Sequence, residues 1–122
     1  MGMSHGIASA IGEYGERLAC EYLTGLGYEV LDRNWRCDQG ELDIVARDGD
    51  SLVFCEVKTR RSTAFGSPVE AVTPAKAARL RRLAVCWLRE HTRHATELRI
   101  DVIGVLRPPR GAAELEHLMG VA

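Results

Sequence analysis

The sequence predicts an α/β protein in which helices pack on a mixed β-sheet. Three observations lead to this prediction: a helical apolar pattern opens the chain, three strand-like segments follow, and a second helical pattern precedes a further strand. With 122 residues, the chain has the size of one domain built around one core. We therefore expect a single domain over residues 1–122, with residues 1–5 loosely held.

The first half of the chain predicts a helix, a strand and a hairpin. Apolar residues recur every three or four positions over residues 4–26, and Gly27 ends this helix. The segment YEVLDRNWR, residues 28–36, has the composition of a strand. Residues 40–60 predict a hairpin, because an Asp-Gly-Asp turn at residues 48–50 separates two apolar strands.

The second half predicts a loop, a helix and two more strands. Residues 61–72, RSTAFGSPVEAV, have the Gly, Ser and Pro of a loop. A Thr-Pro pair then opens a second helix over residues 73–91, with Thr as N-cap. ELRIDVIGVL, residues 97–106, predicts a strand, and ELEHLM, residues 114–119, predicts a short edge strand paired with it.

The composition indicates an ordinary soluble protein, with 46% apolar and 27% charged residues. No apolar run approaches the roughly 20 residues that span a bilayer, and the first residues lack the pattern of a secretory signal. We therefore predict a cytoplasmic protein without membrane contact. The net charge of −1 argues against a uniformly basic binder, but lysines and arginines gather over residues 58–82, where they could present a basic face to a polyanion.

The strand SLVFCEVKTR has charged residues within an apolar pattern. Because side chains alternate along a strand, Glu56 and Lys58 share a face with Leu52 and Phe54. A carboxylate in such a position costs several kcal/mol unless a cation or a hydrogen-bonded partner compensates it. One interpretation is a structural salt bridge between Glu56 and Lys58; the other is a functional site.

The preceding strand supplies further carboxylates. Glu41 and Asp43 leave one face of that strand, and the hairpin brings them near Glu56. Converging carboxylates repel one another unless a divalent cation lies between them, and oxygen ligands suit Mg²⁺ or Mn²⁺. A lysine beside such an ion, here Lys58, can orient a water or stabilise charge on a phosphate. These residues predict metal-assisted hydrolysis of phosphodiester bonds.

Several motifs together resemble a known family. Asp43, followed after twelve residues by Glu56-Val57-Lys58, resembles the PD-(D/E)XK nuclease signature, with Leu42 in place of its proline. The wider pattern resembles the YraN-type family, bacterial proteins of restriction-endonuclease-like fold that are similar to archaeal Holliday junction resolvases. The motifs cover nearly the whole chain in family order: GEYGERLACEYLTGLGYEVLDRNWR, GELDIVARDG, LVFCEVKTR, FGSPVEAV with the following Lys76, and RIDVIGV.

The resemblance implies a fold and a metal site. The fold would be a restriction-endonuclease-like three-layer fold, a central mixed β-sheet flanked by helices in the order α-β-β-β-α-β, with an optional last strand. Asp43, Glu56 and the main-chain carbonyl of Val57 would hold the metal, with Lys58 as the catalytic lysine. Resolvase-like members also use a glutamate of the first helix, here Glu16. Helical geometry independently places Glu16 at the border of the apolar arc.

Other residues are candidates for supporting or substrate-binding roles. Glu41 could support the metal site or be a solvated residue at a strand start. Lys76 falls inside the apolar arc in the first turn of its helix, so it could contact a phosphate, or its stem could lie along apolar surface with its head in water. The full set of such candidates is Glu41, Thr59, Arg60, Arg61, Lys76 and Arg79, with Arg82 added for a nucleic-acid backbone.

We expect a divalent-metal-dependent nuclease that acts on DNA, including branched or flapped structures. The alternative is a binding or adaptor module of the same fold that works with a partner protein. A homodimer also remains open. The four cysteines are interpreted as reduced packing residues and the histidines show no zinc-ligand spacing. Asp101 lies on an apolar strand without an evident partner, and it could support Lys76 or an arginine near the site.

Overall fold

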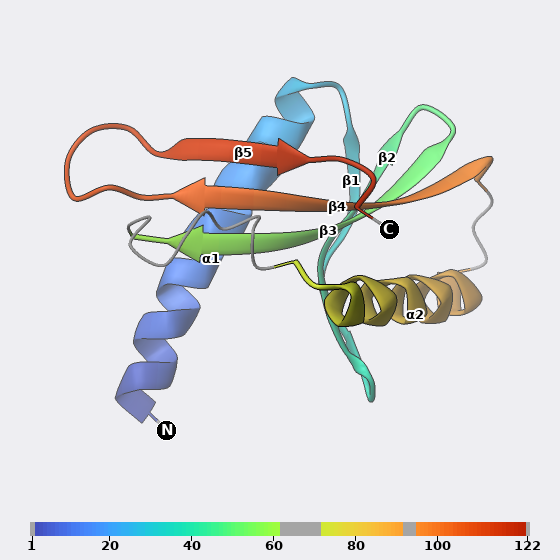
Figure 1. Ribbon diagram of the computed structural model, residues 1–122, viewed down its shortest axis with the longest axis horizontal. Coiled ribbons are helices and arrows are strands. Elements are labelled where there is room, and N and C mark those ends of the chain that lie inside the picture. Colours follow the sequence, from blue (N-terminus) through green and yellow to red (C-terminus); the bar gives the residue numbers. More distant parts are fainter. Residues whose placement is uncertain (1, 62–71, 92–94, 122) are drawn as a thin grey trace.

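The computed structural model describes residues 2–61, 72–91 and 95–121, with the side chains of residues 2–9 left aside (Figure 1). The predicted order of elements is confirmed, including the final strand. The predicted loop over residues 61–72 lies almost wholly outside the described residues. The elements are α1 (Gly2–Gly25), β1 (Glu29–Cys37), β2 (Gly40–Asp48), β3 (Ser51–Arg60), α2 (Pro74–His91), β4 (Glu97–Leu106) and β5 (Glu114–Leu118).

The strands form one mixed sheet in the order β1-β2-β3-β4-β5. Adjacent strands are antiparallel except β3 and β4, which are parallel and are separated in the chain by α2. Gly49 has a φ of 60° in the turn between β2 and β3, which an Asp-Gly sequence adopts without strain. The class of the protein is therefore α/β, as the sequence predicted.

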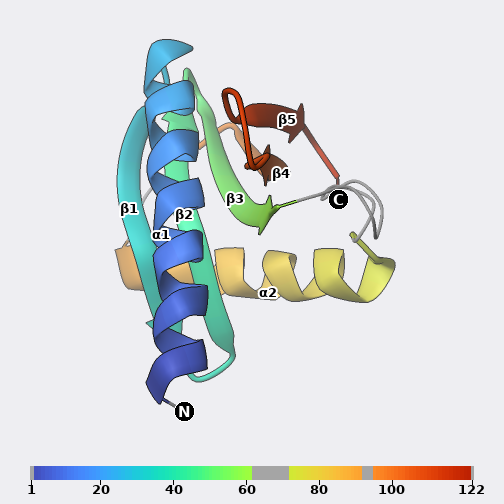
Figure 2. The ribbon, with the colours of Figure 1, turned by 90° about the vertical axis from the view of Figure 1, so that its left-hand side faces the viewer.

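The two helices cover opposite faces of the sheet, with α1 in front of it and α2 behind it in Figure 2. Because side chains alternate, Leu52 and Phe54 of β3 pack with Trp87 of α2. Val53 and Cys55 pack with residues of α1 on the other face. The sheet is thus buried on both sides at its centre, which explains why β3 is apolar at almost every position.

The ends of the helices follow their sequence signals. Thr73 caps α2: its Oγ1 accepts a hydrogen bond of 3.2 Å from the Lys76 main-chain nitrogen. Helix α1 begins at Gly2, ahead of the expected start, and Gly27 with a φ of 94° follows its end. Neither helix in the described part of the chain is long and apolar enough to cross a membrane. All four cysteines are free thiols.

A glycine sets the distance between α1 and the sheet. A Cβ atom at Gly15 would overlap Oγ1 of Thr59 on β3 and would lie 3.1 Å from the Thr59 Cβ. Rotation of the threonine can move Oγ1 away, but the contact with its Cβ at 3.1 Å would remain, so helix and strand would have to move apart slightly. Gly12, one turn earlier, has no atom within 4 Å of such a Cβ. Gly15 therefore holds the following residue, Glu16, close to the sheet.

We expect Gly15→Ala to destabilise the protein by roughly 1–3 kcal/mol, because overpacking against Thr59 outweighs the helical preference of alanine. Gly12→Ala is the matched control and should raise stability by about 0.5–1 kcal/mol. Urea unfolding measures both, and Gly15→Ala/Thr59→Ala should recover part of the loss. Equal effects of the two single alanine variants would contradict the close approach.

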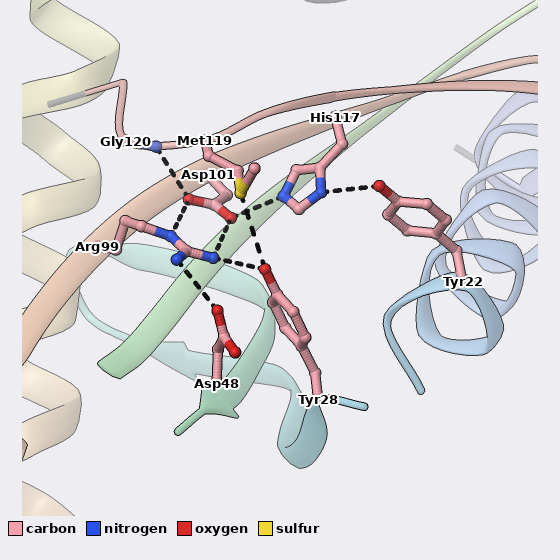
Figure 3. Close-up of polar contacts among 8 residues, drawn as sticks. All are labelled: Tyr22, Tyr28, Asp48, Arg99, Asp101, His117, Met119 and Gly120. Carbon is pink, nitrogen blue, oxygen red and sulfur yellow. Dashed lines mark hydrogen bonds and ion pairs between the residues drawn. The ribbon is translucent and has the colours of Figure 1, made fainter. Parts of the chain in front are cut away.

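A buried ionic cluster of Arg99, Asp101 and His117 lies on the face of the sheet that α1 covers (Figure 3). Asp101 is 0% exposed and accepts four hydrogen bonds. Two come from Arg99 at 3.0 and 3.1 Å, one from His117 Nε2 at 2.7 Å and one from the Gly120 main-chain nitrogen at 3.1 Å. The suggestion that Asp101 supports Lys76 is wrong, because Lys76 belongs to α2, which covers the opposite face.

The cluster connects four elements. Arg99 also donates hydrogen bonds to Asp48 of β2 at 3.2 Å and to the Tyr28 hydroxyl at 2.7 Å. His117 Nδ1 lies 3.0 Å from the Tyr22 hydroxyl of α1. Burial alone would lower the pKa of Arg99, but the hydrogen bonds and charge of Asp101 raise that pKa above its usual range. The cluster therefore fixes β5 and the following residues to the sheet.

We expect Asp101→Ala to destabilise the protein by about 3–5 kcal/mol, because Arg99 loses its buried counter-charge and the Gly120 N–H loses its acceptor. Glu114→Ala, which removes an exposed carboxylate from β5, serves as the control and should stay within about 0.5 kcal/mol of the wild type. Chemical denaturation gives both values. A loss below about 1 kcal/mol for Asp101→Ala would contradict this account of the cluster.

Candidate functional site

Strands β2 and β3 stop pairing where the candidate residues begin. The ladder runs from Asp48↔Ser51 to Ile44↔Cys55, and the next two positions would be Asp43 and Glu56. Beyond that point the main-chain nitrogen of Val57 donates a hydrogen bond of 2.8 Å to Asp43 Oδ2. A side-chain carboxylate thus provides the acceptor that the ladder no longer supplies. The regular pairing of the two strands thus ends beside two acidic residues.

On the other side of β2, strand β1 has an unusual backbone at the same level. The β1–β2 register is the same at Arg33↔Ile44 and Trp35↔Leu42, but Asn34 between them has a φ of 52°. Asparagine tolerates this left-handed conformation better than most residues. Its side-chain amide lies near the Glu16 carboxyl of α1 and acts to lower the pKa of that group. Sequence analysis missed Asn34, although asparagine is depleted in strands and its place in YEVLDRNWR was a usable signal.

Asp43, Glu56 and Glu16 form what we call the carboxylate cluster, with one residue each from β2, β3 and α1. Burial raises the pKa of Asp43 to about 7; the Val57 hydrogen bond opposes this, and the charges of Glu16, Glu56 and Glu41 add to it. Burial is also the main cause of the raised pKa of Glu16. Within residues 2–61, 72–91 and 95–121, however, no three His, Cys, Asp or Glu side chains approach closely enough to hold a metal ion by themselves.

Glu56 is 9% exposed and is poorly satisfied. Its Oε1 lies 3.9 Å from both Lys58 Nζ and an Arg79 guanidinium nitrogen, whereas strong ion-pair hydrogen bonds are near 2.7–2.9 Å. Its Oε2 is buried and has no hydrogen-bond partner among the described residues. The structural salt bridge is thus present but long. It leaves one carboxylate oxygen uncompensated, an arrangement that favours a bound cation.

Two lysines lie side by side next to Glu56, and we call Lys58 and Lys76 the lysine pair. The Lys58 ammonium lowers the pKa of Lys76, first as a hydrogen-bond donor to the neutral Lys76 amine and then through its charge, while the Glu56 charge opposes the shift. The structure therefore brings Lys76 to the candidate site from α2, on the side of the sheet where Leu52 and Phe54 pack. Adjacent ammonium groups repel each other, so an anion between them would be stabilised.

The remaining candidate residues lie at the edge of the candidate site or outside it. Glu41 is 51% exposed and pairs with Arg36 at 3.0 Å, which agrees with the alternative of a solvated residue at a strand start. Thr59 contacts Gly15 of α1, so it has a packing role. Arg60 and Arg61 are exposed at the end of β3; Arg61 lines a separate cavity of about 240 Å³ with residues that follow β4. Arg79, by contrast, contacts Glu56.

Asp43→Asn should make the metal-free protein more stable at pH 8, by roughly 1–3 kcal/mol. The folded-state pKa near 7 exceeds that of an unfolded aspartate near 3.8, so the folded state binds the extra proton. The wild type therefore loses stability as pH rises through this window, whereas asparagine mimics the protonated form. Urea unfolding in EDTA from pH 4 to pH 8 measures the difference, which should vanish toward pH 4.

Asp50→Asn, an exposed change of the same charge, is the control for this experiment. Its stability difference from the wild type should be small over the same pH range. A difference for Asp43→Asn that stays constant with pH would show that the Asp43 carboxyl does not titrate in the expected window.

These features define an α/β protein with a mixed five-stranded sheet, a partly buried carboxylate cluster where two strands diverge, and a lysine pair beside it. The model of the "Uncharacterised protein family UPF0102" matches residues 15–105, and the chain belongs to this family. This confirms the YraN-type identification made from the motifs.

The chain is also similar to curated members of this family over most of its length. It is 65% identical over 112 residues to a UPF0102 protein of Beutenbergia cavernae, covering 92% of this chain and 95% of the relative. It is 60% identical over 115 residues to a UPF0102 protein of Streptomyces coelicolor, covering 93% and 88%. These relatives carry no named activity.

Proposed function

We propose that the protein is a divalent-metal-dependent nuclease of restriction-endonuclease-like fold that hydrolyses phosphodiester bonds of DNA, including branched or flapped DNA, in the cytoplasm. The observation that carries this proposal is the buried Oε2 of Glu56, which has no hydrogen-bond partner within residues 2–61, 72–91 and 95–121 and lies next to the Asp43 carboxyl and Lys58. A purely structural ion pair would be expected to satisfy both carboxylate oxygens.

The donors fit a hard cation such as Mg²⁺ or Mn²⁺. Asp43, Glu56 and the main-chain carbonyl of Val57 would hold it, with Glu16 oriented by Asn34 at the edge. Proteins usually hold Mg²⁺ through one or two carboxylates, with waters and substrate phosphates completing the shell. Fewer than three acidic side chains in direct reach are therefore sufficient. When bound, such an ion polarises a phosphate and lowers the pKa of a coordinated water.

The residues of the chain contribute binding and charge. With a pKa near 7, Asp43 exchanges its proton for a cation near neutral pH, so metal affinity should rise as the pH rises through 7. The lysine pair supplies positive charge where a phosphate would lie, and Lys58 is placed to stabilise charge that develops on the phosphate or to orient a water. Arg79 adds a further positive group beside Glu56.

The second candidate is a nucleic-acid-binding or adaptor module of the same fold that does not cleave. One observation favours it: no closed set of three acidic or metal-binding side chains exists within the described ranges. In this case the lysine pair and Arg79 would bind a phosphate group, and a partner protein or a second copy of the chain would supply the rest of the function.

We expect Mg²⁺- or Mn²⁺-dependent cleavage in a panel of labelled single-stranded, duplex, flap and four-way-junction DNAs and a structured RNA. Glu56→Ala should reduce cleavage at least a hundredfold because it removes a metal ligand, and Lys58→Ala should do the same because it removes charge stabilisation. The rates are measured by gel electrophoresis. Mn²⁺ should also raise the melting temperature of the wild type but not that of Glu56→Ala.

Glu97→Ala, which removes an exposed glutamate at the start of β4, is the control for Glu56→Ala and should leave both readouts unchanged. Lys58→Arg separates loss of charge from loss of the lysine itself. If the wild type binds DNA but cleaves nothing with either metal, and Mn²⁺ does not change its melting temperature, the nuclease proposal fails and the binding module takes its place.

A further inference from the structure

A groove lies between α2 and the end of the β1–β2 hairpin, whose strands cross α2 in Figure 2 before the turn. Its volume is about 330 Å³. The amide of Gln39 in the turn contacts Cys86 Sγ at 3.8 Å, which fixes one wall against the other. The arginine groove, as we call it, is lined by Gln39, Arg81, Arg82, Val85, Cys86 and Arg89.

The groove concentrates uncompensated positive charge. None of its three arginines forms an ion pair with any acidic group in the part of the chain that the structure describes. Arg36 and Arg99 elsewhere in the chain do form such pairs, at 3.0 Å each. Val85 is 43% exposed and supplies an apolar part of the lining. Three like charges around one cavity favour an anionic occupant.

A basic stripe connects the groove to the candidate site. Lys76, Arg79 and Arg82 follow at three-residue steps, each turned by about 60° from the one before, so this row winds around α2; Arg89 lies two turns beyond Arg82 in nearly the same direction. Arg79 contacts Glu56, and Lys76 contacts Lys58. From Lys76 to Arg89 the stripe covers about 20 Å at 1.5 Å per residue. A nucleic-acid backbone that leaves the lysine pair and follows this winding row around α2 would therefore reach the groove.

We propose that the arginine groove binds the phosphodiester backbone of a nucleic acid on one side of the carboxylate cluster. The inference rests on the nucleic-acid part of the proposed function and adds a contact outside the candidate active site. Guanidinium groups match phosphate oxygens in pairs of hydrogen bonds, and the Gln39 amide is a further donor. At 3.4 Å per base pair, the stripe follows on the order of six base pairs of a duplex.

The test measures binding without cleavage. Fluorescence anisotropy of a labelled DNA duplex longer than the stripe is recorded in EDTA over a series of NaCl concentrations. Arg82→Gln/Arg89→Gln should bind about tenfold more weakly, and the slope of log K against log salt should fall by about 2 because two phosphate contacts are lost. The matched control Arg17→Gln/Arg110→Gln makes the same change in net charge at exposed positions and should keep the slope.

Equal affinities and slopes for the two double variants would overturn the inference. Equal loss of binding to polyglutamate or to phosphatidylserine vesicles would also overturn it, because the groove would then recognise any polyanion. If the groove variant alone loses DNA binding but the wild type cleaves no substrate, the groove stands while the nuclease proposal fails. If the wild type cleaves DNA and the groove variant binds like the control, the nuclease proposal stands and the groove inference fails.

Discussion

The hydrogen bond from the Val57 main-chain nitrogen to Asp43 is the contact on which the candidate site depends. In a regular antiparallel pair, main-chain carbonyls would satisfy such a donor and the two strands would continue side by side. Here the carboxylate replaces the carbonyl, so β2 and β3 diverge without an unpaired Val57 N–H. Asp43 and Glu56 lie where the pairing ends; burial raises the pKa of Asp43, and one Glu56 oxygen has no hydrogen-bond partner among the described residues.

The sheet has a buried carboxylate on each face, and the two differ in how well their charges are compensated by hydrogen bonds and ion pairs. Asp101 accepts four hydrogen bonds and joins β4 to β5, so its charge is fully compensated and its role is structural. In the part of the chain that the structure describes, Glu56 has two ion-pair partners at 3.9 Å, and its Oε2 has no hydrogen-bond partner. Because an uncompensated buried carboxylate lowers stability, its presence points to a ligand that the chain itself does not supply. Burial alone does not separate these two cases; the hydrogen-bond partners do.

Much of the site was predictable because short-range sequence spacing dictates it. Alternation along β3 put Glu56 and Lys58 on the face of Leu52 and Phe54, and the Asp-Gly turn fixed the hairpin that brings Asp43 near Glu56. The helical spacing of apolar residues in α1 predicted that Glu16 lies at the border of the face that packs on the sheet. The contact of Asn34 with Glu16 was not predictable, since it depends on a left-handed residue in a strand and on how α1 lies across β1.

By itself the sequence determined the order of the elements, the apolar faces that form the two cores, and the family, because these follow from local periodicity, turn residues and motif spacing. Only the tertiary structure decided which charged residues meet. Arg99 and Asp101 are near neighbours on one strand, but their bonds to Asp48, Tyr28 and His117 depend on the packing of four elements. Lys76 likewise reaches Lys58 only because α2 packs on the face of the sheet that carries Leu52 and Phe54. The packing of helices and strands determines which charged residues of distant segments come into contact. The local sequence pattern does not contain this information.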